Sequence, residues 1–364
     1  MGIALRLGYR MLRPWLFSLD AQAAHDRVLG WLADSDGLAA RISRSARHDA
    51  PVEVAGLLFP NRVGLAAGMD KEAQSVAAFA AMGFGFIEVG SVAPEGESWS
   101  HPPRIHRLPA AGALINRIGL HRGGLRPFCA ALDKLPRPLD SRSPVPVRLG
   151  INLACNAATR AEDALGDYAK GCRATVGSAD YFTINLSNPN APNRHVPTDR
   201  HALSQWLVAM DEIRAGLRNH AGCEPPMFLK LSPDLEQESL EVVAKTVGAH
   251  TAARCDTDRR WGLIVANASS RRDLVGNIPS ASQAGGLSGA PLRDRVERMI
   301  TSLRGMVGTS LPIIGVGGIM SAADARARIH AGADLVQIYT GLIYRGPDLV
   351  REIAAGLISQ AGSS

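Results

Sequence analysis

The chain has 364 residues, of which 46% are hydrophobic, so it is long enough for one large α/β barrel or two ordinary domains. Forty Lys and Arg against 34 Asp and Glu give a formal charge of +6, but no run of five or more basic residues and no recognised module points to nucleic acid, which we do not expect as a partner. The five cysteines are scattered and form no Cys-x-x-Cys pair, which predicts a reduced, cytosolic setting without structural zinc or another metal.

The N-terminal segment from Ile3 to about Ala40 has the apolar periodicity of two short amphipathic helices, with arginines between the apolar positions. This combination suits a helix pair lying at a membrane interface, and it suits equally a helical cap packed on its own domain. No apolar run approaches the roughly 20 residues of a spanning helix, and the N-terminus lacks the apolar core and cleavage site of a signal peptide. We therefore expect a soluble or peripheral protein.

From Val63 onward, short β-rich runs alternate with helix-compatible segments and end in Gly, Asn or Ser. Eight such units predict an α/β fold of the (β/α)8 TIM-barrel class with a small N-terminal helical extension. A doubly wound open sheet is the alternative, but polar residues recur at the ends of many strands, which favours the barrel. The predicted strands are Val63–Ala67, Phe86–Val89, Val147–Asn152, Tyr181–Asn185, Phe228–Leu231, Leu263–Asn267, Ile313–Gly315 and Leu335–Tyr339.

The glycine-rich segment Gly315–Ile319 follows the seventh predicted strand and precedes a helix that is expected to begin near Ser321. Bare backbone amides followed by a helix N-terminus are suited to a phosphate group. Thr340, at the end of the eighth strand, is positioned as a second phosphate donor. A tight turn is the alternative interpretation of the glycines. The chain lacks the Gly-x-Gly-x-x-Gly fingerprint of a dinucleotide-binding fold.

Two lysines and a set of asparagines lie near the predicted strand ends. Lys71 follows the first strand, and Lys230 lies within the apolar run of the fifth. A lysine in an apolar strand is costly to bury without an anionic partner, so the pair indicates an anionic ligand such as a carboxylate or a flavin. Amide side chains offer both donors and acceptors, which suits the edge of a pyrimidine-like ring. The asparagines are Asn116, Asn152, Asn185, Asn190 and Asn267.

These motifs together resemble those of the dihydroorotate dehydrogenases, and more closely the quinone-using, membrane-associated class 2 enzymes than the soluble class 1 forms. The resemblance runs from the N-terminal helices to about residue 350 and includes the strand and loop Tyr181–Pro192. Its most specific segments are Gly-Leu-Ala-Ala-Gly-Met-Asp-Lys, Met-Gly-Phe-Gly-Phe-Ile-Glu-Val-Gly, Leu-Ile-Asn-Arg-Ile-Gly, Gly-Gly-Leu-Ser-Gly and Ile-Ile-Gly-Val-Gly-Gly-Ile.

The resemblance implies an FMN cofactor, a small-molecule substrate and a quinone acceptor. His25 and Arg107 match positions that line the quinone path. Substrate-facing positions are Lys71, Asn116, Leu120, Asn185, Asn190, Asn267 and Ala268. Positions implied to hold FMN are Ala67, Gly68, Ser91, Asn152, Asn185, Lys230, Gly289, Gly318, Tyr339 and Thr340.

The chain departs from the family pattern where substrate chemistry happens. Asn188 stands where the family has its Ser or Cys base, and a carboxamide does not accept a proton at neutral pH, so a general-base contribution of roughly 10²–10⁴ in rate would be lost. Ala268 replaces a threonine, Leu120 a phenylalanine and His121 an amide, whereas the phosphate motifs are intact. The proton would then be taken by water, His121, Cys155 or the substrate itself.

This distribution favours an FMN-dependent oxidoreductase of the family, acting on CH–CH bonds, that passes hydride between a small ring or acid and flavin N5 with a changed substrate or a lost proton-abstraction step. The alternative is a genuine quinone-dependent dihydroorotate dehydrogenase of pyrimidine biosynthesis, and a second is a non-catalytic flavin-binding paralogue. We expect residues 1–45 to form the membrane and quinone mouth and residues 46–364 the FMN-binding barrel. The expected location is cytoplasmic, peripheral on the inner face of the cell membrane.

Overall fold

A closed barrel of parallel strands forms the centre of the computed structural model, which describes residues 2–33, 47–96, 104–187, 197–253 and 261–358. The strands follow one another around the barrel in chain order, so the predicted TIM barrel is confirmed and the open-sheet alternative is wrong. Each predicted strand overlaps an observed one, with ends that differ by at most three residues. The barrel strands are β3 (Val63–Leu65), β4 (Phe86–Val92), β7 (Arg148–Leu153), β8 (Tyr181–Asn185), β9 (Met227–Leu231), β10 (Trp261–Val265), β12 (Ile313–Val316) and β13 (Leu335–Ile338).

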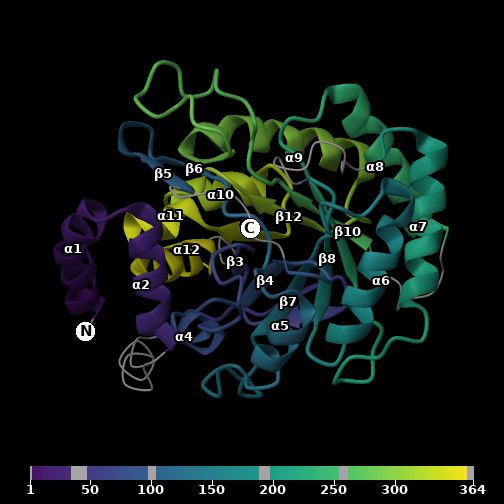
Figure 1. Ribbon diagram of the computed structural model, residues 1–364, viewed down its shortest axis with the longest axis horizontal. Coiled ribbons are helices and arrows are strands. Elements are labelled where there is room, and N and C mark those ends of the chain that lie inside the picture. Colours follow the sequence, from purple (N-terminus) through teal and green to yellow (C-terminus); the bar gives the residue numbers. More distant parts are fainter. Residues whose placement is uncertain (1, 34–46, 97–103, 188–196, 254–260, 359–364) are drawn as a thin grey trace.

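Helices cover the outside of the barrel (Figure 1), and their apolar faces pack on the outward-facing side chains of the strands. This arrangement buries the strands on both faces, which explains why they read as continuous apolar runs. The covering helices are α4 (Val76–Ala81), α5 (Leu125–Leu132), α6 (Ala164–Thr175), α7 (Arg200–Arg214), α8 (Gln237–Ala252), α9 (Arg293–Val307), α10 (Ala322–His330), α11 (Thr340–Arg345) and α12 (Asp348–Ile358).

A hairpin that the sequence did not predict closes the N-terminal end of the barrel. Its strands β1 (Val52–Val54) and β2 (Leu57–Phe59) pair antiparallel, and Arg148 at the start of β7 donates to the Leu58 carbonyl. Phe59 is fully buried and meets Phe86 edge to face, with ring centroids 5.3 Å apart. The barrel interior above this aromatic layer is therefore reached from the opposite, C-terminal end.

A three-stranded antiparallel sheet, also not predicted, lies in the loops beyond the C-terminal ends of the barrel strands. It consists of β5 (Ile105–Leu108), β6 (Ala113–Asn116) and β11 (Gly286–Gly289), in the order β11-β6-β5. Its strands come from the connections after β4 and β10, and the pairing sets Gly286 opposite Asn116. Two segments far apart in the sequence are thereby brought to the same end of the barrel.

The two predicted N-terminal helices are α1 (Gly2–Ser18) and α2 (Ala21–Ala33), which lie beside α11 and α12 (Figure 1). The Tyr9 hydroxyl donates to the Ile343 carbonyl at 2.5 Å, and Arg13 donates to the Tyr344 carbonyl at 2.9 Å. Arg107 on β5 donates to the carbonyls of Leu16, Phe17 and Leu19 where α1 ends. Among the described residues, no helix has the length and apolarity needed to cross a membrane.

Candidate active site

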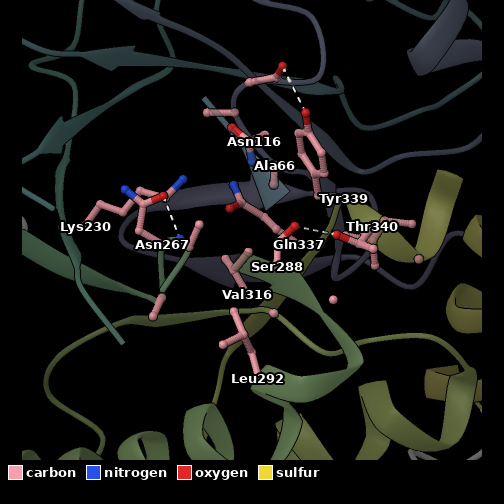
Figure 2. A pocket seen from close by; sticks show the side chains of 18 of the residues that line it. Ala66, Asn116, Lys230, Asn267, Ser288, Leu292, Val316, Gln337, Tyr339 and Thr340 are labelled. Carbon is pink, nitrogen blue, oxygen red and sulfur yellow. Dashed lines mark hydrogen bonds between the residues drawn. The ribbon is translucent and has the colours of Figure 1, made fainter. Parts of the chain in front are cut away.

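A cavity at the C-terminal ends of the barrel strands brings together most of the predicted site residues (Figure 2). Its walls include nine of the ten residues implied to hold a flavin, the exception being Asn152, which is buried below the cavity. Asn188 and Asn190 lie outside the described residues. The predicted residues that line the cavity are Ala67, Gly68, Lys71, Ser91, Asn116, Leu120, Asn185, Lys230, Asn267, Ala268, Gly289, Gly318, Tyr339 and Thr340.

One end of the cavity is built from the glycine loop after β12. Gly317 and Gly318 have φ angles of +111° and +74°, and a Cβ on Gly318 would lie 2.5 Å from the Cα of Arg293. Only glycine therefore fits this turn. Helix α10 begins at Ala322, close to the predicted start near Ser321, and the Ser321 side chain caps it by accepting from the Asp324 amide. The hydroxyls of Ser288 and Thr340, 2.9 Å apart, face the same cavity, so this end offers amides and hydroxyls that fit a phosphate group.

The opposite wall carries Lys230 and interlinked amides. The Lys230 ammonium lies 3.5 Å from the Glu88 carboxylate on β4, and both side chains are buried. Asn267 donates to Asn185 Oδ1 at 3.3 Å, and Asn185 donates to Ser91 Oγ at 3.0 Å. A cation and amides at one end, with phosphate donors at the other, fit the ring and the phosphate of FMN.

Lys71 lies beside the asparagine wall and has an unusual electrostatic environment. Its ammonium donates to the Gly119 carbonyl, and both residues line the cavity with Asn116. Burial lowers the pKa of Lys71 to about 7, although the nearby Glu72 carboxylate opposes this shift. A half-buried lysine with so low a pKa gains a full charge when an anionic group binds next to it.

The side chains proposed as substitute proton acceptors are occupied by protein groups. His121 Nδ1 accepts the amide N–H of Gly123 at 3.0 Å, and its Nε2 lies 2.6 Å from a Glu72 carboxylate oxygen. Cys155 is buried and does not line the cavity. Ser187 does not line it either, but its hydroxyl donates to Asn185 Oδ1 at 3.2 Å and accepts from Asn267 at 3.0 Å.

A second, mainly apolar cavity lies between the N-terminal helices and the barrel. His25 of α2 and Arg107 of β5 line it, as do Leu16, Phe79 and other apolar side chains. Burial lowers the pKa of His25 to about 4, so this imidazole is neutral at neutral pH. Asn116 and Tyr339 line both cavities. The two cavities therefore adjoin at these side chains.

The sequence model of the family described as dihydroorotate dehydrogenase matches residues 50–360, which is most of the chain. The chain belongs to the dihydroorotate dehydrogenase family. It is 44% identical over 350 residues to the dihydroorotate dehydrogenase (quinone) of Methylibium petroleiphilum, covering 96% of this chain and 98% of that protein. It is 42% identical over 350 residues to the protein of the same name from Delftia acidovorans, covering 96% and 97%. These relatives are of the quinone type, as the sequence motifs predicted.

Solved structures of dihydroorotate dehydrogenases are also similar. The crystal structure of the Eimeria tenella DHODH in complex with ferulenol superposes with a TM-score of 0.82 at 32% identity, covering 94% of this chain and 92% of that one. The ligand-free type of the same enzyme gives a TM-score of 0.80 at 32% identity, covering 94% and 96%. The family assignment therefore rests on sequence and on fold.

Three polar residues of this dihydroorotate dehydrogenase family site were missed from the sequence. Gln337 and Glu88 lie in the middle of apolar strands, and Ser288 lies on a strand that was not predicted. A charged residue inside the run Phe-Ile-Glu-Val was the available signal for Glu88, and it is the same signal that identified Lys230.

Proposed function

We propose that this protein is a quinone-dependent dihydroorotate dehydrogenase of pyrimidine biosynthesis. The observation that carries the proposal is the pair of adjoining cavities, one polar and one apolar, that share Asn116 and Tyr339. Such a pair suits an enzyme that meets a polar reductant and an apolar oxidant at the same cofactor. The names of the relatives favour this parent activity, and nothing in the comparisons favours the changed substrate that the sequence analysis preferred.

The donor set of the polar cavity supports FMN as the cofactor, because the glycine loop and hydroxyls suit its phosphate and Lys230 suits its ring edge. FMN, when bound, supplies the hydride acceptor and the electron donor to the quinone. Gly318, Ser288 and Thr340 would hold the phosphate. The residues proposed to surround the remainder are Ala67, Gly68, Ser91, Asn152, Asn185, Lys230, Gly289 and Tyr339.

The proposed substrate wall recognises a small carboxylated pyrimidine. Lys71 would neutralise the carboxylate, and the amides of Asn116, Asn185, Asn190 and Asn267 would pair with the alternating C=O and N–H groups of the ring. Leu120 and Ala268 would supply apolar contacts at the edge of the site. Asn188, in the base position, would orient the substrate without accepting its proton, which would pass to water.

The N-terminal helices are proposed to form the quinone entrance and a peripheral membrane contact on the inner face of the cell membrane. Among the side chains that the structure describes in these helices, the exposed large apolar ones are Met11, Leu12, Trp15 and Trp31. Trp15 and Trp31 stack with ring centroids 5.8 Å apart and an interplanar angle of 13°. Exposed tryptophans among arginines suit the headgroup region of a bilayer. On this proposal residues 1–45 serve the membrane and residues 46–364 the chemistry.

The decisive experiment is anaerobic mixing of the purified yellow protein with dihydroorotate while flavin absorbance is followed. Rapid bleaching, followed by recovery of the colour on adding a quinone, is the expected result. A flavin that stays oxidised with dihydroorotate but bleaches with another dihydro compound would support the changed-substrate alternative instead. A protein that binds FMN but is bleached by none of these compounds, and whose photoreduced flavin no quinone reoxidises, would be a non-catalytic paralogue.

A further inference from the structure

Glu88 is a fully buried carboxylate inside the barrel, below the polar cavity. It sits on β4 and receives contacts from the side chains of four other strands. Asn152 and Gln337 each donate to it at 2.8 Å, the Tyr181 hydroxyl donates at 3.3 Å, and Lys230 Nζ lies at 3.5 Å. Beneath it lies the aromatic layer of the barrel, so these four groups supply its polar environment.

Because a carboxylate only accepts hydrogen bonds, Glu88 determines which way its neighbours face. Asn152 must turn its NH₂ group toward Glu88, so its carbonyl accepts from the Ser91 hydroxyl at 2.5 Å. Ser91 then accepts from the NH₂ of Asn185 at 3.0 Å. Asn185 in turn presents its carbonyl to the NH₂ of Asn267 at 3.3 Å. Every bond in this chain therefore runs toward Glu88.

The charge of Glu88 also balances Lys230. The lysine is buried and lines the cavity, and an unpaired ammonium in that position would be strongly destabilising. Gln337 donates to the same carboxylate from the cavity wall, while its own side-chain carbonyl is buried with no hydrogen-bond partner in the described structure. The carboxylate thus fixes two cavity-lining side chains directly and three further polar side chains through the chain of bonds.

We propose that Glu88 is a positioning residue, which sets the direction of the Asn152–Ser91–Asn185–Asn267 hydrogen-bond chain and balances the charge of Lys230 beneath the flavin ring. The inference deepens the proposed function, because the ligands that these groups address are taken from it. Glu88 itself does not line the cavity and contacts no reacting atom. We therefore expect Glu88 to affect the affinity of the site for orotate and the midpoint potential of the bound flavin.

The test compares the holoprotein with E88Q, E88D and a matched control, T183V. Glutamine has nearly the shape of glutamate but turns an NH₂ group toward two of the present donors, and it leaves Lys230 without a counter-charge. Aspartate keeps the charge. Thr183 is fully buried on β8, which is separated from β4 by β7, and its hydroxyl has no hydrogen-bond partner in the described structure. T183V therefore changes the barrel interior without touching the chain of bonds.

Two quantities are measured: the midpoint potential of the bound FMN and the dissociation constant of orotate from the oxidised holoprotein. Removing the Glu88 charge should favour the more negative, reduced flavin about tenfold, which raises a two-electron potential by about 30 mV. Orotate binding should nevertheless weaken about tenfold in E88Q, because the turned NH₂ group disrupts the hydrogen-bond chain that orients Asn185 and Asn267, and this outweighs the loss of a negative charge near the anion. E88D should stay within threefold of the wild type both in the equilibrium between oxidised and reduced flavin and in the orotate dissociation constant. T183V should match the wild type in both. An E88Q protein with wild-type potential and orotate affinity would overturn the proposal.

A second comparison keeps the inference testable if E88Q does not fold. The double variant E88Q/K230M removes both members of the buried ion pair, which should restore folding that the single variant loses. Failure of the double variant to improve on E88Q would contradict the pairing with Lys230. If the wild type binds FMN but neither orotate nor dihydroorotate, the proposed function fails, while the potentials still test Glu88.

Discussion

Lys71 has a charge that depends on what binds beside it. Its pKa is lowered to about 7 by burial, so the free protein holds a mixture of charged and neutral lysine at neutral pH. An arriving carboxylate favours the charged form, and above pH 7 binding must take up a proton. The protonation state of Lys71 thus makes the affinity of the site for an anionic substrate depend on pH.

We expect the affinity for orotate to fall as pH rises above about 7, by up to tenfold per pH unit, and to level off below it. The sign follows because the ammonium is present below the pKa and lost above it. Orotate dissociation constants between pH 6 and 9 measure the effect. K71M should bind orotate weakly at every pH, and a wild-type affinity that does not change between pH 7 and 9 would contradict the role of Lys71.

Asn188 gives a second prediction at this scale. If the protein oxidises dihydroorotate with an amide in the base position, the substrate proton already leaves by another route. N188S should then change the rate of flavin bleaching less than about threefold. A gain of roughly 10²–10⁴ would instead show that the base was missing and that the native substrate needs no such base.

The glycine loop after β12 depends on Arg328 of α10, an arginine that is fully buried. Its guanidinium donates to the Gly317 carbonyl at 2.9 Å and, through two nitrogens, to the Arg293 carbonyl at 3.2 Å. Burial lowers the pKa of Arg328 to about 10, so it stays charged at neutral pH. By holding the Gly317 carbonyl away from the cavity, it leaves the following amides available to a phosphate.

R328M should therefore weaken FMN binding about tenfold and riboflavin binding less than threefold, because only FMN has the phosphate. Fluorescence titration of the apoprotein with each compound separates the two. The matched control is R326M, because Arg326 lies on the same helix but faces Gly356 of α12. Equal weakening of both flavins would mean that Arg328 supports the barrel in general and not the phosphate end.

The N-terminal helix pair is the element proposed to meet the membrane. Deleting residues 1–40 should release the protein from anionic vesicles and weaken quinone reduction, while dihydroorotate still bleaches the flavin. W15A/W31A should lower vesicle binding and leave the cavity beside the helices in place, since neither tryptophan lines it. Cosedimentation and quinone kinetics are the measurements, and unchanged values after the deletion would refute the proposed membrane role.

For the molecule as a whole, the cavity is built from many strand ends, so filling it should stabilise the entire barrel. At an FMN concentration of 100 times its dissociation constant, binding adds about 2.7 kcal/mol to the free energy of unfolding. For a chain of 364 residues that corresponds to a rise in Tm of about 3–4 °C. Differential scanning calorimetry of apoprotein and holoprotein checks this, with riboflavin as the control that lacks the phosphate. An identical Tm for both forms would contradict the fit of the cavity to FMN.

Much of this architecture was predictable, because the barrel strands are apolar runs, most of which end at or beside a polar residue or a glycine. That rule located Lys230 and the asparagines. It failed for Glu88 and Gln337, whose partners come from other strands and become visible only when the barrel closes. It failed also for the hairpin and the three-stranded sheet, whose strands are only three or four residues long. In the sheet, β11 moreover pairs with the distant strand β6.

The two cavities that share Asn116 and Tyr339 have a kinetic consequence. On the proposed function, dihydroorotate binds in the polar cavity and the quinone in the apolar one, so the two do not compete for space. A compound that fills the apolar cavity beside the N-terminal helices would thus inhibit turnover at every concentration of dihydroorotate. Raising the dihydroorotate concentration would not displace it. An inhibitor of the polar cavity and an inhibitor of the apolar cavity would bind the protein at the same time. Each half-reaction, flavin reduction or reoxidation by quinone, could therefore be inhibited separately.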